Sequence, residues 1–306
     1  MTQTLSILSP IFILLILGYA LRSQKVLQEG FWDGLNRAIY FVFFPSLIVY
    51  KLSTTKLDYE SGLDILLVGL IGLAIMTAVA VISSKAFDLR KTDLPVMVQA
   101  FIRFNAFLFL AFVDVLLEEE FFVFAILISV MSIIFVNTLS VYFLSAQDDA
   151  KSWEALVNTG GQLAKNPLVI ASIVGLFING FALTLPPVAE NSLRLLSEPT
   201  LVLGVLSVGA GLHWRNLWER KYLVLYICAT RLILHPLIVF VIGRWFGLEE
   251  PLLFMLCLFA GNSTAISSYI LTKEMKGDHQ LMSSVITALV LFSLPTLMGI
   301  IYLFTA

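Results

Sequence analysis

Long apolar runs separated by short polar segments fill almost the whole chain. Several of these runs contain 17 or more residues with almost no charge. As a helix, a run of this length crosses a hydrocarbon core of about 30 Å. The pattern therefore predicts ten membrane-spanning helices, at about residues 5–21, 34–52, 63–84, 95–113, 121–144, 167–184, 190–212, 222–246, 251–271 and 281–304.

The composition supports the same class of protein. The chain has 306 residues, of which 59% are hydrophobic and 13% charged, whereas soluble domains have about 45–50% and about 25%. We therefore expect an all-α polytopic membrane protein that contacts the lipid bilayer. The sequence contains no His/Cys cluster, phosphate-binding loop or Ser/His/Asp grouping. These absences predict no enzyme, no metal site, no cofactor and no nucleic-acid partner.

Basic residues orient the predicted spans. The loops after the odd-numbered spans hold 13 of the 19 Lys and Arg residues. Cytoplasmic loops of membrane proteins accumulate these residues. We therefore predict that both termini lie outside, in a protein of the plasma (inner) membrane.

The longest polar linker, residues 145–166, follows the fifth span and divides the chain into halves of five spans, 1–150 and 151–306. Because five is an odd number, the second half enters the membrane from the opposite side, which predicts an inverted repeat. Helix-breaking prolines, Pro45 and Pro199, occur in the second span of the first half and of the second half, as expected for a transporter site between inverted halves.

A run of small polar residues interrupts the predicted ninth span. Gly261, Asn262, Ser263 and Thr264 are poor helix formers whose side chains compete for backbone hydrogen bonds. In lipid, a broken helix survives only where it lines a cavity or is buried in protein. We interpret Gly261 as a helix break and the other three residues as ligands of an anion, which the freed N–H groups also favour. Close helix–helix packing is the alternative interpretation.

The predicted fourth span contains a matching polar pair, Arg103 and Asn105. We interpret Asn105 as a substrate ligand. Arg103 either faces the bundle interior, where a charge costs roughly 2.5–3.5 kcal/mol, or extends to the membrane surface. In the second span, Pro45 has no N–H to donate within the helix. The Ser46 hydroxyl either supplies the missing hydrogen bond or faces the substrate.

Three further ionisable residues lie inside predicted spans. Glu198 precedes Pro199 in the seventh span and is a candidate for proton coupling, unless the span boundary places it at the outer interface. Arg231 and His235 in the eighth span are candidates for charge or proton coupling, or are packing residues. The coupling ion, Na⁺ or H⁺, is left open.

Six motifs in this order resemble the auxin efflux carrier family, which includes bacterial organic-anion permeases and the plant PIN carriers. They are "LILGYALRSQKVL" (15–27), "LNRAIYFVFFPSLIVYKL" (35–52), "IRFNAF" (102–107), "KNPLVIASIVGLF" (165–177), "EPTLVLGVLSVGAGL" (198–212) and "STAISSYILTKEMKGDHQLMSS" (263–284). The resemblance implies a ten-helix inverted-repeat fold like that of bile-acid sodium symporters, which works as an elevator and forms a homodimer. It also implies that broken spans 4 and 9 cross at the substrate site, where Asn105 and Asn262–Thr264 line the site beside Ser46.

The chain departs from the family pattern at two positions. Phe112 and Ser263 stand where the family has a proline at each crossover, so spans 4 and 9 either break by other means or are straighter than usual. The leading functional prediction is secondary transport of a small organic anion. The alternatives are a sodium- or proton-coupled symporter or antiporter of the same fold, and a membrane sensor that does not transport.

Overall fold

The computed structural model describes residues 2–55, 59–86, 89–145, 160–161, 164–213 and 220–305, and these residues form helices and turns without any strand. The all-helical prediction is therefore confirmed for the described part of the chain. Most of the linker 145–166, including the predicted boundary between the halves at 150 and 151, lies outside the described residues. The division into two halves stays a prediction.

The helices follow one another along the chain in a fixed order. They are α1 (Thr2–Ser23), α2 (Glu29–Ala38), η1 (Ile39–Phe43), α3 (Phe44–Thr54), α4 (Tyr59–Ala86), α5 (Asp93–Ile102), α6 (Ala106–Leu116), α7 (Glu119–Ser145), α9 (Pro167–Gly180), α10 (Pro187–Ser197), α11 (Thr200–Ala210), α12 (Lys221–Ala229), η2 (Thr230–Leu234), α13 (His235–Trp245), α14 (Glu250–Ala260), α15 (Ser267–Glu274) and α16 (His279–Thr305).

Within the described residues, seven helical stretches are long and apolar enough to cross a membrane, and each coincides with one predicted span. They are Glu29–Thr54, Gly62–Ala86, Asp93–Leu116, Glu119–Ser145, Pro187–Ala210, Lys221–Trp245 and His279–Phe304. The other three predicted spans fall on the shorter apolar helices Leu8–Ser23, Pro167–Gly180 and Glu250–Ala260. The chain is thus an integral membrane protein, with seven candidate spans among the residues that the structure describes.

Two helices are interrupted where the sequence places its polar residues. The first interruption, residues 103–105, separates α5 from α6, and Asn105 caps α6 by accepting a hydrogen bond from the Leu108 N–H at 3.3 Å. The second interruption, residues 261–266, separates α14 from α15. Neither interruption contains a proline: Phe112 lies inside α6, and Ser263 lies within the second interruption. Side-chain capping of the helix end replaces the missing proline in the first case.

Two prolines distort a helical stretch without interrupting it, and each of them follows a π-helical segment. Pro45 follows η1 and Pro236 follows η2, each at the start of the next α-helix. A proline cannot donate a backbone hydrogen bond, and a π-helical turn shifts the bonding pattern by one residue. The distortion predicted at Pro45 is therefore a local widening of the helix, not a gap in it.

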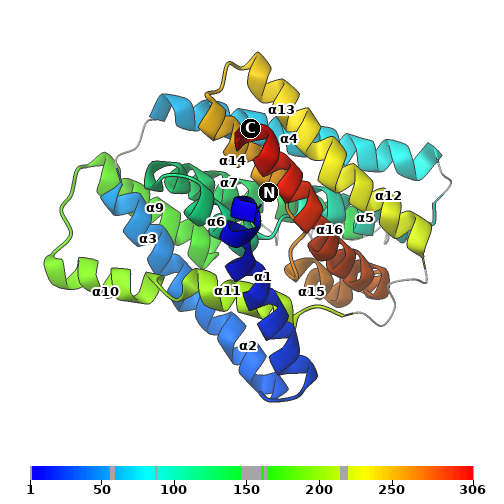
Figure 1. The fold of residues 1–306 in the computed structure, drawn as a ribbon, viewed down its shortest axis with the longest axis horizontal. Coiled ribbons are helices and arrows are strands. Elements are labelled where there is room, and N and C mark those ends of the chain that lie inside the picture. Colours follow the sequence, from blue (N-terminus) through cyan, green and yellow to red (C-terminus); the bar gives the residue numbers. More distant parts are fainter. Residues whose placement is uncertain are drawn as a thin grey trace.

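The contacts between the helices divide the fold into two groups, and Figure 1 shows α2, α3, α10 and α11 of the first group towards the lower left and α4, α12 and α13 of the second towards the upper right. In the first group, α1 and α2 pack on α11, η1 contacts α2 and α11, and α3 packs on α9 and α10. In the second group, α4 packs on α5, α7 and α13, α13 packs on α14, and α16 packs on α5, α12, α14 and α15. Helix α6 packs on α7 and α14 of the second group and also on α1 and α11 of the first, so it lies where the two groups meet. Both helix interruptions belong to the second group.

Glycines allow the closest packing in the first group. A Cβ atom at Gly18 of α1 would lie 1.9 Å from the Leu206 carbonyl oxygen, and one at Gly209 of α11 would lie 2.0 Å from the Leu15 carbonyl oxygen. These distances are far below van der Waals contact, so only glycine permits the α1–α11 approach. Small residues at helix contacts are typical of membrane helices.

Ion pairs join the starts of three helices of the second group. The Asp93 carboxylate, which is fully buried, accepts hydrogen bonds from Arg220 just before α12 and lies 3.5 Å from Arg90. Arg90 also lies 3.7 Å from Asp278, just before α16. The hydrogen bond to Asp93 raises the pKa of the Arg220 guanidinium above its ordinary value. The cluster fixes α5, α12 and α16 relative to one another.

Candidate functional site

A cavity of about 860 Å³ lies between the two groups of helices. Its walls come from α2, η1, α3, α9 and α11 of the first group, and from α6, α7, α15 and both interruptions of the second. The residues that line it are Asp33, Asn36, Arg37, Tyr40, Phe41, Phe44, Arg103, Phe104, Asn105, Ala106, Phe107, Ile133, Val136, Asn137, Asn166, Leu168, Gly204, Ser207, Val208, Ala265, Ile266, Ser267, Ile270 and Glu274.

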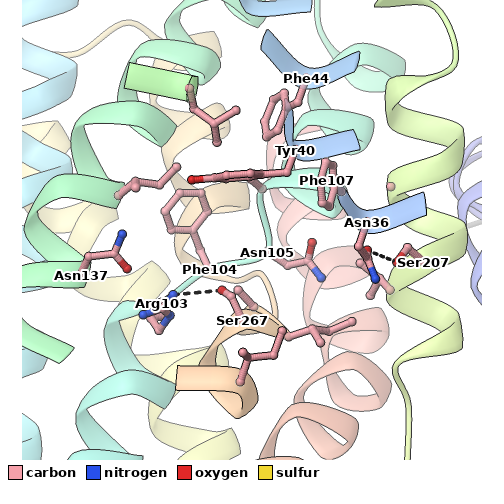
Figure 2. Close-up of a pocket in the computed structure, with 18 of the residues that line it drawn as sticks. Asn36, Tyr40, Phe44, Arg103, Phe104, Asn105, Phe107, Asn137, Ser207 and Ser267 are labelled. Atoms are coloured by element: carbon pink, nitrogen blue, oxygen red, sulfur yellow. Dashed lines mark hydrogen bonds between the residues drawn. The ribbon is translucent and has the colours of Figure 1, made fainter. Parts of the chain in front are cut away.

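Arg103 supplies a buried positive charge to this cavity. Its guanidinium donates a hydrogen bond to the Ser267 hydroxyl at 2.9 Å (Figure 2). It also donates to the Ser140 hydroxyl at 3.4 Å. Its side chain forms no ion pair with any described carboxylate. Only 8% of the residue is exposed, so the charge is held inside the protein and does not extend to the membrane surface. A buried cation without a carboxylate favours an anion beside it.

Asn105 supplies an unused hydrogen-bond donor beside that charge. Its side-chain oxygen caps α6, while its side-chain nitrogen is buried and has no hydrogen-bond partner among the described residues. Buried polar groups without a partner are rare and costly. The Asn105 amide is therefore available to a molecule in the cavity.

The N-terminal ends of two helices meet the cavity at the same place. Asn105 precedes the first residue of α6, and Ser267 is the first residue of α15. Helix N-termini carry unpaired N–H groups and a partial positive charge, both of which favour an anion. With Arg103, these ends make this part of the cavity electropositive.

Aromatic side chains form the other wall. Figure 2 shows Tyr40, Phe44, Phe104 and Phe107 around the space above Arg103 and Asn105. Phe44 and Phe107 come from different groups, and their ring centroids lie 5.2 Å apart. The cavity thus offers a cationic, hydrogen-bonding end beside an apolar surface, an arrangement that suits a carboxylate attached to an apolar body.

The residues predicted in the second interruption are joined to the first interruption and do not line the cavity. The Asn262 amide donates to the Asn105 carbonyl oxygen at 2.6 Å, and the Asn105 N–H donates to the Ser263 carbonyl oxygen at 2.9 Å. The Thr264 hydroxyl donates to the Gln99 carbonyl oxygen at 3.3 Å. Asn262, Ser263 and Thr264 are fully buried, and the next two residues of the interruption face the cavity in their place.

The structure also does not bring Ser46 or Glu198 to the cavity. Ser46 donates its hydroxyl to the Val42 carbonyl oxygen of its own helix at 2.8 Å. Glu198 pairs with Arg194 at 2.9 Å, and 57% of its side chain is exposed.

The two other predicted helix-break positions lie at helix ends. Pro199 is the N-cap residue of α11, and Gly261 directly follows α14. A Cβ at Gly261 would lie 2.6 Å from the Ile300 side chain, so α14 and α16 pack closely there.

Arg231 and His235 lie together behind the interruptions, away from the cavity. Both residues are fully buried, and the Arg231 guanidinium contacts the His235 ring nitrogen Nδ1. Arg231 also donates to the Phe101 carbonyl oxygen at 2.7 Å and to the Asn262 carbonyl oxygen at 3.3 Å. Arg231 therefore contacts the backbone of the interrupted helices instead of the cavity.

Several polar lining residues were missed from the sequence. Asn36 and Ser207 face the cavity and are joined by a 2.5 Å hydrogen bond between α2 and α11 (Figure 2). Asn137 lines it from α7. Asn137 is a lone amide in a long apolar run, which is the same signal that identified Asn105. Asn36 and Ser207 lie near span ends or among small residues, where polar side chains are common.

The comparison with known families gives one match. A family model described as membrane transport protein matches residues 5–301 of the chain, which is nearly its full length. No curated protein matches the chain.

Proposed function

Because the chain belongs to the auxin efflux carrier family of membrane transport proteins, we propose that it is a secondary transporter of a small organic anion. The substrate carboxylate binds between the Arg103 guanidinium and the Asn105 amide, and its apolar part lies against the aromatic wall. The observation that carries this proposal is the cavity itself, where a buried cation without a carboxylate partner among the described residues lies beside an unpaired amide donor.

The second interruption has a supporting role in this proposal. Asn262 holds the Asn105 backbone through its amide, and Ser263 accepts from the Asn105 N–H. These contacts fix the direction of the Asn105 side chain. The binding groups therefore come from the first interruption, and the second orients them.

The ten-span inverted repeat with an elevator movement is part of the same proposal. The separation of the helices into two groups, with the cavity between them, supports it, because one group can then carry the cavity past the other. With both termini outside, as the basic loops indicate, the ends of α2 and α15 that hold Asp33 and Glu274 face the cytoplasm. The cavity then opens inward. A homodimer is also part of this proposal.

Counterflow in proteoliposomes tests the binding site. Proteoliposomes preloaded with an unlabelled acid are offered a panel of labelled mono- and dicarboxylates. We expect Arg103→Gln and Asn105→Ala to weaken uptake of the accepted acid by about 10- to 100-fold, since a hydrogen bond to a charged group contributes about 1.5–3 kcal/mol.

The matched controls carry the same substitutions outside the cavity. Arg244→Gln changes an exposed arginine paired with Glu250, and Asn191→Ala changes an exposed amide of α10. Both should transport like the unmodified protein. Uptake that survives Arg103→Gln and Asn105→Ala at the level of these controls would disprove the proposed site.

A further inference from the structure

The buried guanidinium of Arg231 contacts the ends of both helices that lead into the interruptions. Arg231, in η2, is fully buried. Its Nη1 donates to the carbonyl oxygen of Phe101, near the end of α5, and its Nε donates to the carbonyl oxygen of Asn262, just beyond α14. The positive charge thus lies between the C-terminal ends of the two helices that lead into the interruptions.

These carbonyl groups are available because the helices end there. In a continuous helix, the Phe101 oxygen would accept from the Asn105 N–H. That N–H instead donates to the Ser263 carbonyl oxygen, which leaves the Phe101 oxygen free for Arg231. Asn262 lies two residues beyond Ala260, the last residue of α14, so its carbonyl lies outside the helical pattern.

No carboxylate of the described residues pairs with Arg231 to balance its charge. Its guanidinium contacts the imidazole ring of His235 instead. Helix C-termini carry a partial negative charge from their unpaired carbonyl groups. The ends of α5 and α14 are therefore the counter-charge that stabilises the guanidinium.

Backbone carbonyl groups at helix interruptions are the ligands with which many transporters bind a coupling cation. We propose that Arg231 is a built-in cation that takes the place of such an ion and holds the two interruptions together. If the chain is the transporter proposed above, transport should need no free Na⁺ at this position. Only this consequence rests on the proposed function. Arg231 is thus a positioning residue, which holds the Phe101 and Asn262 carbonyl groups beside the two interruptions without touching the substrate.

Thermal unfolding of the purified full chain tests this proposal without any transport measurement. Unfolding temperatures are compared in NaCl, KCl, methylguanidinium chloride and choline chloride at equal ionic strength. We expect the unmodified protein to be indifferent to the cation. Arg231→Ala should lower the unfolding temperature in choline by roughly 5–10 °C, and at least one smaller cation should recover part of the loss in a saturable way.

The control for cation rescue is Arg103→Ala, which removes a buried arginine that donates to hydroxyl groups rather than to helix-end carbonyls. It should show no difference between cations. Saturable stabilisation of the unmodified protein by Na⁺ would overturn the proposal, as would an Arg231→Ala protein that no cation stabilises relative to choline.

Arg231→Lys provides a second variant in case the alanine protein does not fold. It keeps a positive charge at this position, so we expect it to fold and to remain indifferent to Na⁺. A lysine variant that fails to fold, or that Na⁺ stabilises, would also overturn the proposal. The two proposals can fail separately. If the Arg103 and Asn105 variants lose transport but no cation stabilises Arg231→Ala, the binding site is supported and only the proposed role of Arg231 is rejected.

Discussion

Asn105 and Asn262 lie at the two helix interruptions and contact each other directly. The Asn105 side-chain nitrogen, beside the cavity, has no hydrogen-bond partner in the described part of the chain. The Asn262 side-chain nitrogen donates to the Asn105 carbonyl oxygen, and the Asn262 side-chain oxygen accepts from the Ser263 N–H at 2.7 Å. The same amide therefore presents a donor to a ligand at one position and completes backbone hydrogen bonds at the other. Chemical identity alone does not distinguish these roles.

Substitution of Asn262, whose amide is buried, should lower the stability of the protein directly and its transport only as a consequence. Asn262→Ala leaves the Asn105 carbonyl oxygen and the Ser263 N–H without these partners in a fully buried place. We expect a loss of about 2 kcal/mol and an unfolding temperature lower by roughly 4–8 °C, measured against Asn191→Ala as the exposed control. An unfolding temperature equal to that of the control would show that these bonds do not orient the interruption.

At the scale of helices, the interruptions near Asn105 and Asn262 could be predicted because small polar residues are exceptional in apolar runs. Which side chain faces the cavity could not be predicted. That depends on the Asn105–Ser263 backbone bond, which joins residues far apart in the sequence. The π-helical segments before Pro45 and Pro236 were not predicted either, because a proline signals a distortion without specifying its form.

The α1–α11 contact gives a test at this scale. Gly18→Ala should force the two helices apart, because its Cβ would lie 1.9 Å from the Leu206 carbonyl oxygen. Overpacking of this kind costs about 1–3 kcal/mol, so the unfolding temperature should fall by several degrees. The matched control is Gly34→Ala in α2, where a Cβ meets no atom within 4 Å and alanine is the better helix former. A fall of equal size in both variants would contradict the close contact.

At the scale of the whole molecule, the position of the cavity follows from how the two groups of helices meet. Its walls combine η1 and α11 of the first group with the first interruption and α15 of the second. Hydropathy predicts each helix separately but contains no information on which helices pack together. The apolar wall was therefore not predicted, although each of its aromatic residues lies in a predicted span.

The same interface provides a test of relative movement between the groups. The Phe107 ring of α6 lies against Gly204 of α11, and a Cβ at Gly204 would lie 2.5 Å from the Phe107 Cγ. Cysteines at both positions should therefore be close enough to form a disulfide. If transport requires one group to move past the other, the oxidised Gly204→Cys, Phe107→Cys protein should lose nearly all counterflow and regain it on reduction.

Three measurements make this result specific. Oxidation should leave the counterflow of each single cysteine variant equal to that of its own reduced form, because the native Cys228 and Cys257 are buried and offer no ready partner. Mass spectrometry should show the intended disulfide in the oxidised double variant. Full counterflow by that cross-linked protein would mean that the substrate crosses without displacement of α6 along α11, and the movement would then have to be confined within one group.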